Sequence, residues 1–113
     1  MTRSKYGNKR TKIDGITFAS KAEANRYLIL KSREQAGEIQ DLHCHPRFVI
    51  QESFWNEGNH VRAITYEADF EYYLPDGVQV VEDVKGVETK VFKIKAKMFK
   101  KHYGHIKFRT IPA

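Results

Sequence analysis

The chain has 113 residues, a net charge of +6 and a hydrophobic content of 41%. Its length suits one domain with a modest core, and its composition argues against disorder. The positive charge favours a polyanion such as nucleic acid as the binding partner. A membrane surface is less favoured, because the chain has no amphipathic anchor or lipidation motif. It also has no apolar run of the ~20 residues that a membrane helix needs. With Cys44 as the single cysteine, no internal disulfide can form, which indicates a reducing cytoplasm.

The N-terminus predicts a mobile basic arm over residues 1–12, followed by a single domain over residues 13–113. The arm has no acidic residue and lacks the apolar middle of a secretion signal. Its basic side chains are Arg3, Lys5, Lys9, Arg10 and Lys12. Residues 13–18 place an Asp-Gly pair between apolar residues, which favours a small hairpin or an extended segment.

A first helix is predicted from Ser20 to residue 36, with Ser20 as N-cap and Gly37 as the stop. Its expected core stripe is Ala24, Tyr27, Leu28 and Leu30. Glu23 lies at the edge of this stripe and has two interpretations that remain equally open. Its carboxylate points at a sheet, or it closes a capping box with Ser20.

Residues 42–51 predict a strand that Pro46 restricts to an edge or a bulge. Residues 52–60 predict a polar loop. Residues 66–85 then predict a β-hairpin, because two β-prone runs flank the turn Pro75-Asp76-Gly77.

This turn sets a register for the hairpin, which a bulge at Gly77 would shift by one residue. The predicted opposed pairs are Asp69 with Asp83, Glu67 with Lys85, and Phe70 with Glu82. One face then carries the polar side chains of Glu67, Asp69, Glu71, Asp83 and Lys85. The other face is largely apolar and carries Ala68, Phe70, Tyr72, Val80, Val84 and also Glu82.

The opposed carboxylates Asp69 and Asp83 are the most informative feature of the hairpin. Like charges directly opposite one another are destabilising, and a divalent cation would remove that cost. With Lys85 on the same face, the pair predicts a magnesium site for cutting a phosphodiester. The plainer interpretation is that Asp69 lies on the solvent-exposed face of a half-buried strand.

A second helix is predicted over residues 89–102, ending near Gly104, with a last strand over residues 105–111. Its apolar arc is expected to be Val91, Phe92, Ile94, Met98, Phe99 and Tyr103. The opposite arc holds Lys90, Lys93, Lys97, Lys100 and Lys101. These lysines repel one another, so they form a solvated face or contact a phosphate backbone, and the second interpretation is slightly favoured.

The predicted order α-β-β-β-α-β implies an α/β (α+β) protein with a single mixed sheet and helices packed on it. This pattern resembles the PD-(D/E)xK nuclease superfamily, whose restriction-endonuclease-like core has that order. The matching positions are Glu23, Asp69 and Asp83-Val84-Lys85, although Ala68 replaces the proline of the motif. Glu82 rivals Asp83, but the register directs it to the apolar face.

Over nearly its whole length the chain also resembles a family of small phage and prophage proteins of uncharacterised role. The shared segments are residues 6–9, 20–24, 64–66, 68–70 and 81–86. This likeness implies a phage or prophage protein acting in the cytoplasm of a bacterial host.

The nuclease resemblance implies hydrolysis of DNA with Mg²⁺ or Mn²⁺. Asp69, Asp83 and the carbonyl of Val84 would hold the ion, with Glu23 completing the shell, and Lys85 would orient the water or stabilise the transition state. Basic side chains of the arm and the second helix would bind DNA: Lys5, Lys9, Arg10, Lys90, Lys93, Lys97 and Lys100. We expect a homodimer that prefers branched DNA such as four-way junctions, since so small a domain has little room to read bases.

Three alternatives differ from this hypothesis. A catalytically idle DNA-binding or regulatory protein would retain the fold and the basic surface. A zinc site would use His43, Cys44, His45 and His60, but these residues lack the usual ligand spacing. An HNH-type nuclease site would use the same histidines with Asn56 or Asn59, but the expected strand-strand-helix order is absent.

Overall fold

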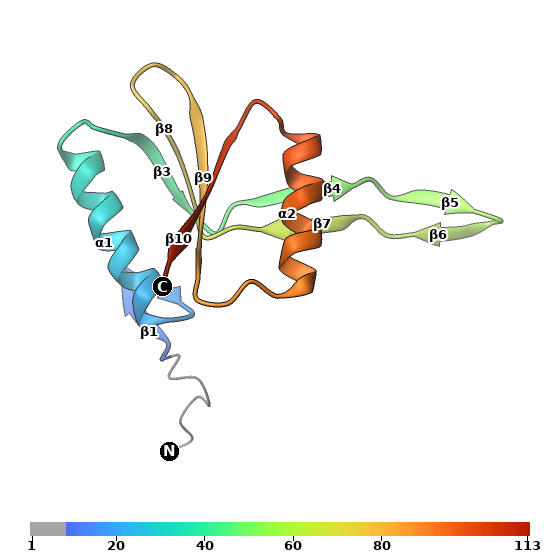
Figure 1. Cartoon of the computed structure of the whole chain (residues 1–113), viewed down its shortest axis with the longest axis horizontal. Coiled ribbons are helices and arrows are strands. Elements are labelled where there is room, and N and C mark those ends of the chain that lie inside the picture. Colours follow the sequence, from blue (N-terminus) through green and yellow to red (C-terminus); the bar gives the residue numbers. More distant parts are fainter. Residues whose placement is uncertain (1–8) are drawn as a thin grey trace.

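The computed structural model describes residues 9–113, and these fold into two helices and ten strands (Figure 1). The main sheet has the strand order β10-β9-β8-β3. Its strands are β3 (Gln40–Cys44), β8 (Phe70–Tyr73), β9 (Gln79–Lys85) and β10 (Lys107–Pro112). β10 runs parallel to β9, and the other neighbours are antiparallel.

Helices α1 (Lys21–Gln35) and α2 (Lys90–His102) lie on opposite sides of this sheet (Figure 1). α1 precedes β3 and α2 precedes β10, so the elements of the main sheet follow the predicted order α-β-β-β-α-β. The α+β class is confirmed. Within residues 9–113, no helix is long and apolar enough to cross a membrane.

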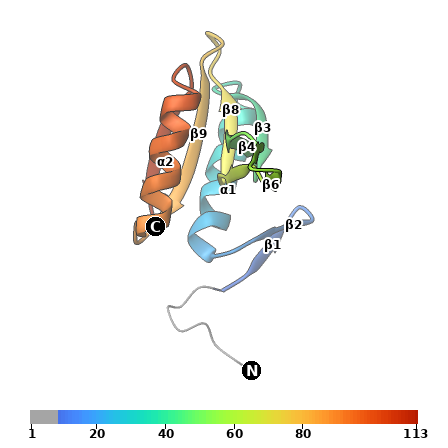
Figure 2. The ribbon, with the colours of Figure 1, turned by 90° about the vertical axis from the view of Figure 1, so that its right-hand side faces the viewer.

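The prediction of a single sheet is wrong, because the described chain also forms three two-stranded sheets. These pair β1 (Thr11–Ile13) with β2 (Ile16–Phe18), β4 (Arg47–Gln51) with β7 (Ile64–Glu67), and β5 (Phe54–Asn56) with β6 (Asn59–Val61). The last two follow one another in an arm that projects from the main sheet (Figure 1) and points toward the viewer in Figure 2.

The arm begins where the predicted strand over residues 42–51 breaks. His45 has a left-handed φ of 56°, and Pro46 follows with no N–H to donate, so the chain turns out of the main sheet between β3 and β4. The predicted polar loop over residues 52–60 is also wrong. Glu57 and Gly58, at φ 49° and 79°, make a tight turn that allows β5 and β6 to pair.

The structure confirms the hairpin predicted near the N-terminus and changes the bounds of the segment before it. Asp14 and Gly15 form the turn between β1 and β2, at φ 53° and 78°, which confirms the small hairpin. Thr11 and Lys12, which the prediction placed in the basic arm, belong to β1. The first eight residues of the predicted arm, with Arg3 and Lys5, lie outside the described residues.

Helix α1 is capped as predicted, with the Ser20 hydroxyl accepting the Glu23 N–H at 3.2 Å. Gly37 follows the helix at a φ of 79°, a conformation that favours glycine. The core stripe of Ala24, Tyr27 and Leu30 is buried, but Leu28 is 50% exposed. Leu28 was predicted to be core and instead falls beyond the edge of the face that meets the sheet.

Helix α2 begins after Thr89, whose hydroxyl accepts the N–H of Phe92. Phe92, Ala96 and Phe99 are buried against the sheet. The predicted core residues Val91 and Ile94 are instead 63% and 59% exposed. A regular period identifies the side of a helix that is apolar, but the neighbouring strands determine how much of it is covered.

The hairpin register is confirmed where β8 and β9 pair, with Phe70 opposite Glu82. The predicted pair of Glu67 with Lys85 is wrong, because the chain breaks at Ala68 between β7 and β8, and Glu67 pairs with Arg47 of β4. Ala68 consequently joins the core beneath α2 rather than the face of Phe70.

The plainer interpretation, in which Asp69 lies on a solvent-exposed strand face, does not agree with the structure, because helices cover both sides of the hairpin strands. α1 packs over one side of β8 and β9, and α2 packs over the other. Asp83 is only 1% exposed as a result.

Candidate metal centre

Asp69 and Asp83 lie close together where the chain passes from β7 to β8 beside β9. Asp69 lies in the break between β7 and β8, and its N–H donates to the carbonyl of Glu82 at 3.1 Å, which fixes it beside β9. Its Oδ2 accepts the N–H of Val84 at 2.7 Å. The Tyr66 hydroxyl donates to Oδ2 of Asp83. The Asp83 carboxyl group lies close enough to raise the pKa of Asp69, so the structure brings the two side chains together. The paired register of β8 and β9 begins one residue later, at Phe70 and Glu82.

This contact changes the acidity of Asp69. The pKa of Asp69 is raised to about 8, with burial as the largest cause and the contact with Asp83 and its negative charge as the next. The Val84 N–H acts in the opposite direction. Two carboxylates this close cannot both ionise easily, so near neutral pH the pair shares a proton.

Glu23 reaches the same site from α1. Its side chain is buried, and its Oε1 lies 2.8 Å from Nε2 of His45. Its negative charge contributes to the raised pKa of Asp69. Among residues 9–113 no hydrogen bond runs from the Ser20 N–H back to Glu23, so the Ser20 side chain caps α1 while the Glu23 carboxylate faces the sheet.

Lys85 approaches the pair from the α2 side. Its Nζ lies 3.7 Å from Oδ1 of Asp83 and 4.8 Å from the centre of the Phe92 ring. The side chain is 31% exposed, so the ammonium group can face both the carboxylates and solvent. The structure therefore brings together Glu23, Asp69, Asp83 and Lys85, the four residues predicted to be catalytic.

The donor chemistry of this cluster fits a hard divalent cation, since carboxylate oxygens are the ligands that Mg²⁺ and Mn²⁺ prefer. A cation could also replace the proton that the two aspartates share. In the described part of the chain, however, no three His, Cys, Asp or Glu side chains are arranged to hold a metal ion directly. Each carboxylate has a protein partner, and Val84 contacts Asp69 through its N–H rather than the predicted carbonyl.

His45 and Tyr66 are site residues that the sequence analysis did not identify in these roles. His45 follows β3 and donates its backbone N–H to the carbonyl of Asp69 at 2.9 Å, while its ring contacts Glu23. Tyr66 lies in β7, and its hydroxyl is directed at Asp83. A histidine directly before Pro46, the residue that predicts an edge or a bulge, was the available signal for the first. Nothing in the local sequence distinguishes Tyr66 from a core aromatic residue.

The four residues of the zinc alternative, whose histidines the HNH alternative shares, do not converge. His43 lies 3.9 Å from Glu71 on β8, and the His60 ring packs at a tilt against Trp55 in the projecting arm. Cys44 lies near the carboxylates, but burial and the negative charges of Glu23 and Asp69 raise the pKa of its thiol to about 11. A thiol that holds its proton so firmly is a poor metal ligand and a weak nucleophile.

Glu82, the sequence rival of Asp83, lies on the opposite face of the sheet. It is fully buried, and Arg26 binds both of its carboxylate oxygens at 2.7 and 2.8 Å. The Tyr72 hydroxyl also donates to it. Glu82 lies on the face of Phe70 and Val80, as the register predicted, and this face packs against α1. Glu82 therefore takes no part in the cluster of Asp69 and Asp83.

The residues predicted to bind DNA lie outside the cluster. Lys9 and Arg10 are exposed near the N-terminus of the described chain, and Lys5 lies outside the described residues. The exposed lysines of α2 include Lys90, Lys93, Lys97 and Lys100. Their solvated position agrees with both interpretations of this helix face.

Comparisons with curated proteins and with solved structures found no match to this chain. The profile of a family described as proteins of unknown function, DUF1064, matches residues 3–112. This match spans almost the entire chain, and the protein therefore belongs to the DUF1064 family.

Proposed function

We propose that this protein is a divalent-metal-dependent DNA endonuclease of the PD-(D/E)xK type, which hydrolyses phosphodiester bonds. The observation that carries the proposal is the close approach of the Asp69 and Asp83 carboxyl groups, with Lys85 3.7 Å from Asp83 and Glu23 reaching the same site from α1. Holding two carboxylates together in a partly buried site lowers the stability of the protein. Strongly shifted pKa values of this kind concentrate at functional sites. The resemblance to the nuclease superfamily identifies the same four residues.

In this proposal Asp69, Asp83, Glu23 and the Val84 carbonyl would hold Mg²⁺ or Mn²⁺. The bound ion would supply an activated hydroxide and neutralise charge on the scissile phosphate. Asp69 has to release its proton to solvent before it can serve as an anionic ligand. The contact with His45 fixes the Glu23 carboxylate toward the sheet.

Lys85 contributes positive charge at the open side of the cluster. Its ammonium group, 3.7 Å from Asp83, is positioned to stabilise the charge that develops on a phosphate bound there. The ring of Phe92 beneath it limits where the ammonium group can lie.

The DNA partner rests on charge and on small size. The net charge of +6 and the exposed lysines of α2 favour a phosphate backbone. We extend the proposal to branched DNA, including four-way junctions, cut by a homodimer during phage DNA metabolism in the host cytoplasm. This finer part rests on the family resemblance and on the two active sites that paired incisions require.

A second candidate function is an idle nuclease fold that binds DNA without cutting it. One observation favours it, since each of the three carboxylates already has a partner within the protein and no metal-holding group is formed in residues 9–113. Under this alternative the Asp69–Asp83 pair would have only a structural role.

Nicking of supercoiled plasmid and of a labelled four-way junction separates the two functions. The wild type should cut in Mg²⁺ or Mn²⁺ and stop in EDTA, while Asp69→Ala and Asp83→Ala abolish cutting and retain DNA binding. Exposed Glu52 offers a matched control, and Glu52→Ala should cut normally. Cutting that persists in EDTA would refute the metal, and binding without cutting in any divalent ion would support the idle fold.

A further inference from the structure

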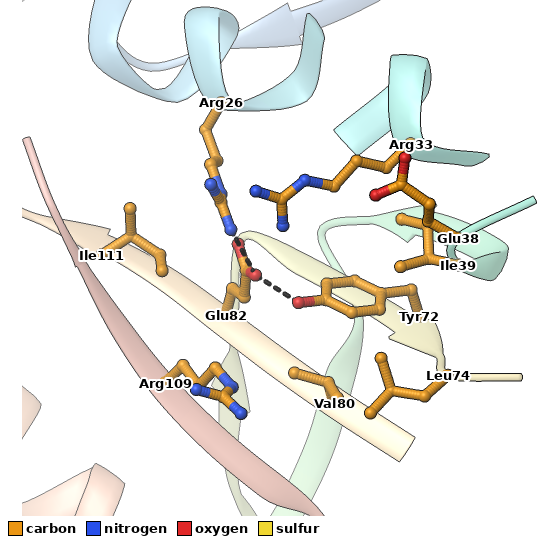
Figure 3. A pocket seen from close by; sticks show the side chains of 10 residues that line it. All are labelled: Arg26, Arg33, Glu38, Ile39, Tyr72, Leu74, Val80, Glu82, Arg109 and Ile111. Atoms are coloured by element: carbon orange, nitrogen blue, oxygen red, sulfur yellow. Dashed lines mark hydrogen bonds and ion pairs between the residues drawn. The ribbon is translucent and has the colours of Figure 1, made fainter. Parts of the chain in front are cut away.

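A pocket of about 380 Å³ lies on the α1 side of the main sheet (Figure 3). Its walls come from α1 and from β8, β9 and β10, and Asp83 lies on the opposite face of β9. The floor includes the ring of Tyr72 with Val80, and Leu74 and Ile111 flank it (Figure 3). It is therefore a concave site with an apolar floor, separate from the carboxylate cluster.

Three arginines line this pocket, two from α1 and one from β10. They are Arg26, Arg33 and Arg109 (Figure 3). Arg26 forms an ion pair with Glu82 and donates to its carboxylate through two nitrogens. Arg109 pairs with Glu82 in the β10–β9 register, so its side chain lies on the same face of the sheet.

The charges in the pocket do not balance. The ion pairs among residues 9–113 give Arg33 and Arg109 no carboxylate partner. Glu38 is the only other acid in the lining. Three arginines and two glutamates leave one positive charge in excess. The two guanidinium groups without partners come from different elements, so an anion between them would receive donors from two sides.

The shape of the pocket narrows the class of anion. A guanidinium fork matches phosphate geometry, and two forks suit the several oxygens of a phosphate monoester. A bare inorganic ion has no apolar surface to pack against the floor, whereas a planar or apolar group attached to the phosphate would contact it. The volume lies within the usual range of pockets for small ligands.

We propose that this pocket binds a small phosphate monoester of the size of a nucleoside monophosphate. Arg33 and Arg109 hold the phosphate, and the Tyr72 side of the floor receives the base or a comparable apolar group. The Arg26–Glu82 pair holds the floor in place and is not displaced. Binding requires no metal, because none of these residues belongs to the carboxylate cluster.

The test is an NMR titration of isotope-labelled protein in EDTA with thymidine 5′-monophosphate, inorganic phosphate or thymidine. We expect saturable shifts of the Ile39 and Ile111 methyl signals and of the Arg33 and Arg109 side-chain signals with the nucleotide. Inorganic phosphate should bind more weakly and thymidine should not bind. The double variant R33Q/R109Q should lose about tenfold in affinity or more, since each lost bond is to a charged group.

Both exchanged arginines are exposed, so the variant should fold, and its amide spectrum checks this directly. Arg62→Gln is the matched control, because Arg62 is an exposed arginine outside the pocket. Shifts confined to the lysines of α2, or equal affinity in R33Q/R109Q, would overturn the proposal. Equal affinity for inorganic phosphate would overturn the role of the apolar floor. Asp69→Asn should bind the nucleotide normally, so the outcome is independent of the proposed nuclease activity.

Discussion

The shared proton of Asp69 and Asp83 should make the stability of the metal-free protein depend on pH. The pKa of Asp69 is about 8 in the folded protein, against an ordinary value of 3.8. Between these values the folded state holds the proton and the unfolded state has lost it. Raising the pH therefore favours unfolding, and the free energy of unfolding should fall by up to about 1.4 kcal/mol per pH unit from this group.

Asp69→Asn should remove this dependence. The asparagine oxygen can still accept the Val84 N–H, and its NH₂ group can donate to Asp83 as the protonated acid does. The stability of the variant relative to the wild type should therefore rise by about 1.4 kcal/mol per pH unit between about pH 5.5 and about pH 7.5. Near the upper limit we expect the variant to be the more stable protein, although it lacks a proposed metal ligand.

Urea unfolding followed by far-ultraviolet circular dichroism in EDTA measures this difference. Contributions from titratable groups that the two proteins share cancel in the comparison. Glu52→Gln changes an exposed carboxylate, and its stability should run parallel to that of the wild type. A constant difference between Asp69→Asn and the wild type at every pH would show that Asp69 holds no extra proton and would refute the close contact with Asp83.

Two further substitutions examine the rest of the cluster. Lys85→Ala should lower the cleavage rate by orders of magnitude and change the free energy of unfolding by less than about 1 kcal/mol, because a partly exposed lysine beside an aromatic ring and a carboxylate contributes little to stability; a large drop in melting temperature would make it a structural residue. Glu23→Gln retains the helix cap from Ser20 and can still hydrogen-bond to His45, so melting should change little while cleavage falls. Full activity of Glu23→Gln in the plasmid assay would remove Glu23 from the metal site.

Local signals predicted a substantial part of the fold. The turn at Pro75-Asp76-Gly77 determined the β8–β9 register, because a short loop between strands leaves few possible pairings. Ser20 and Gly37 marked the ends of α1 through capping and left-handed backbone geometry. The same local rules placed the Asp14-Gly15 hairpin correctly.

The errors arose where distant segments determine the structure. The breaks at Pro46 and Ala68 allow β4 and β7 to leave the main sheet together. Pro46 signalled an irregularity but not a change of sheet, and the break at Ala68 is not apparent without knowing that β4 and β7 pair. Val91 and Ile94 fit the period of a buried face, but the strands beneath α2 do not extend to cover them. The Asp69–Asp83 contact was predictable because one hairpin contains both residues. The contacts of Glu23 with His45 and of Tyr66 with Asp83 depend on how separate elements pack.

Calorimetric titration of Mn²⁺ or Mg²⁺ into the protein at about pH 6.5, in buffers of different ionisation enthalpy, tests the central claim most directly. If the aspartate pair is a metal site, binding must displace the shared proton, and about one proton should be released for each ion bound. Asp69→Asn should bind weakly and release none. Binding without proton release, or the same release from Asp69→Asn, would place the ion elsewhere, and failure of the wild type to bind either ion would contradict the metal site itself.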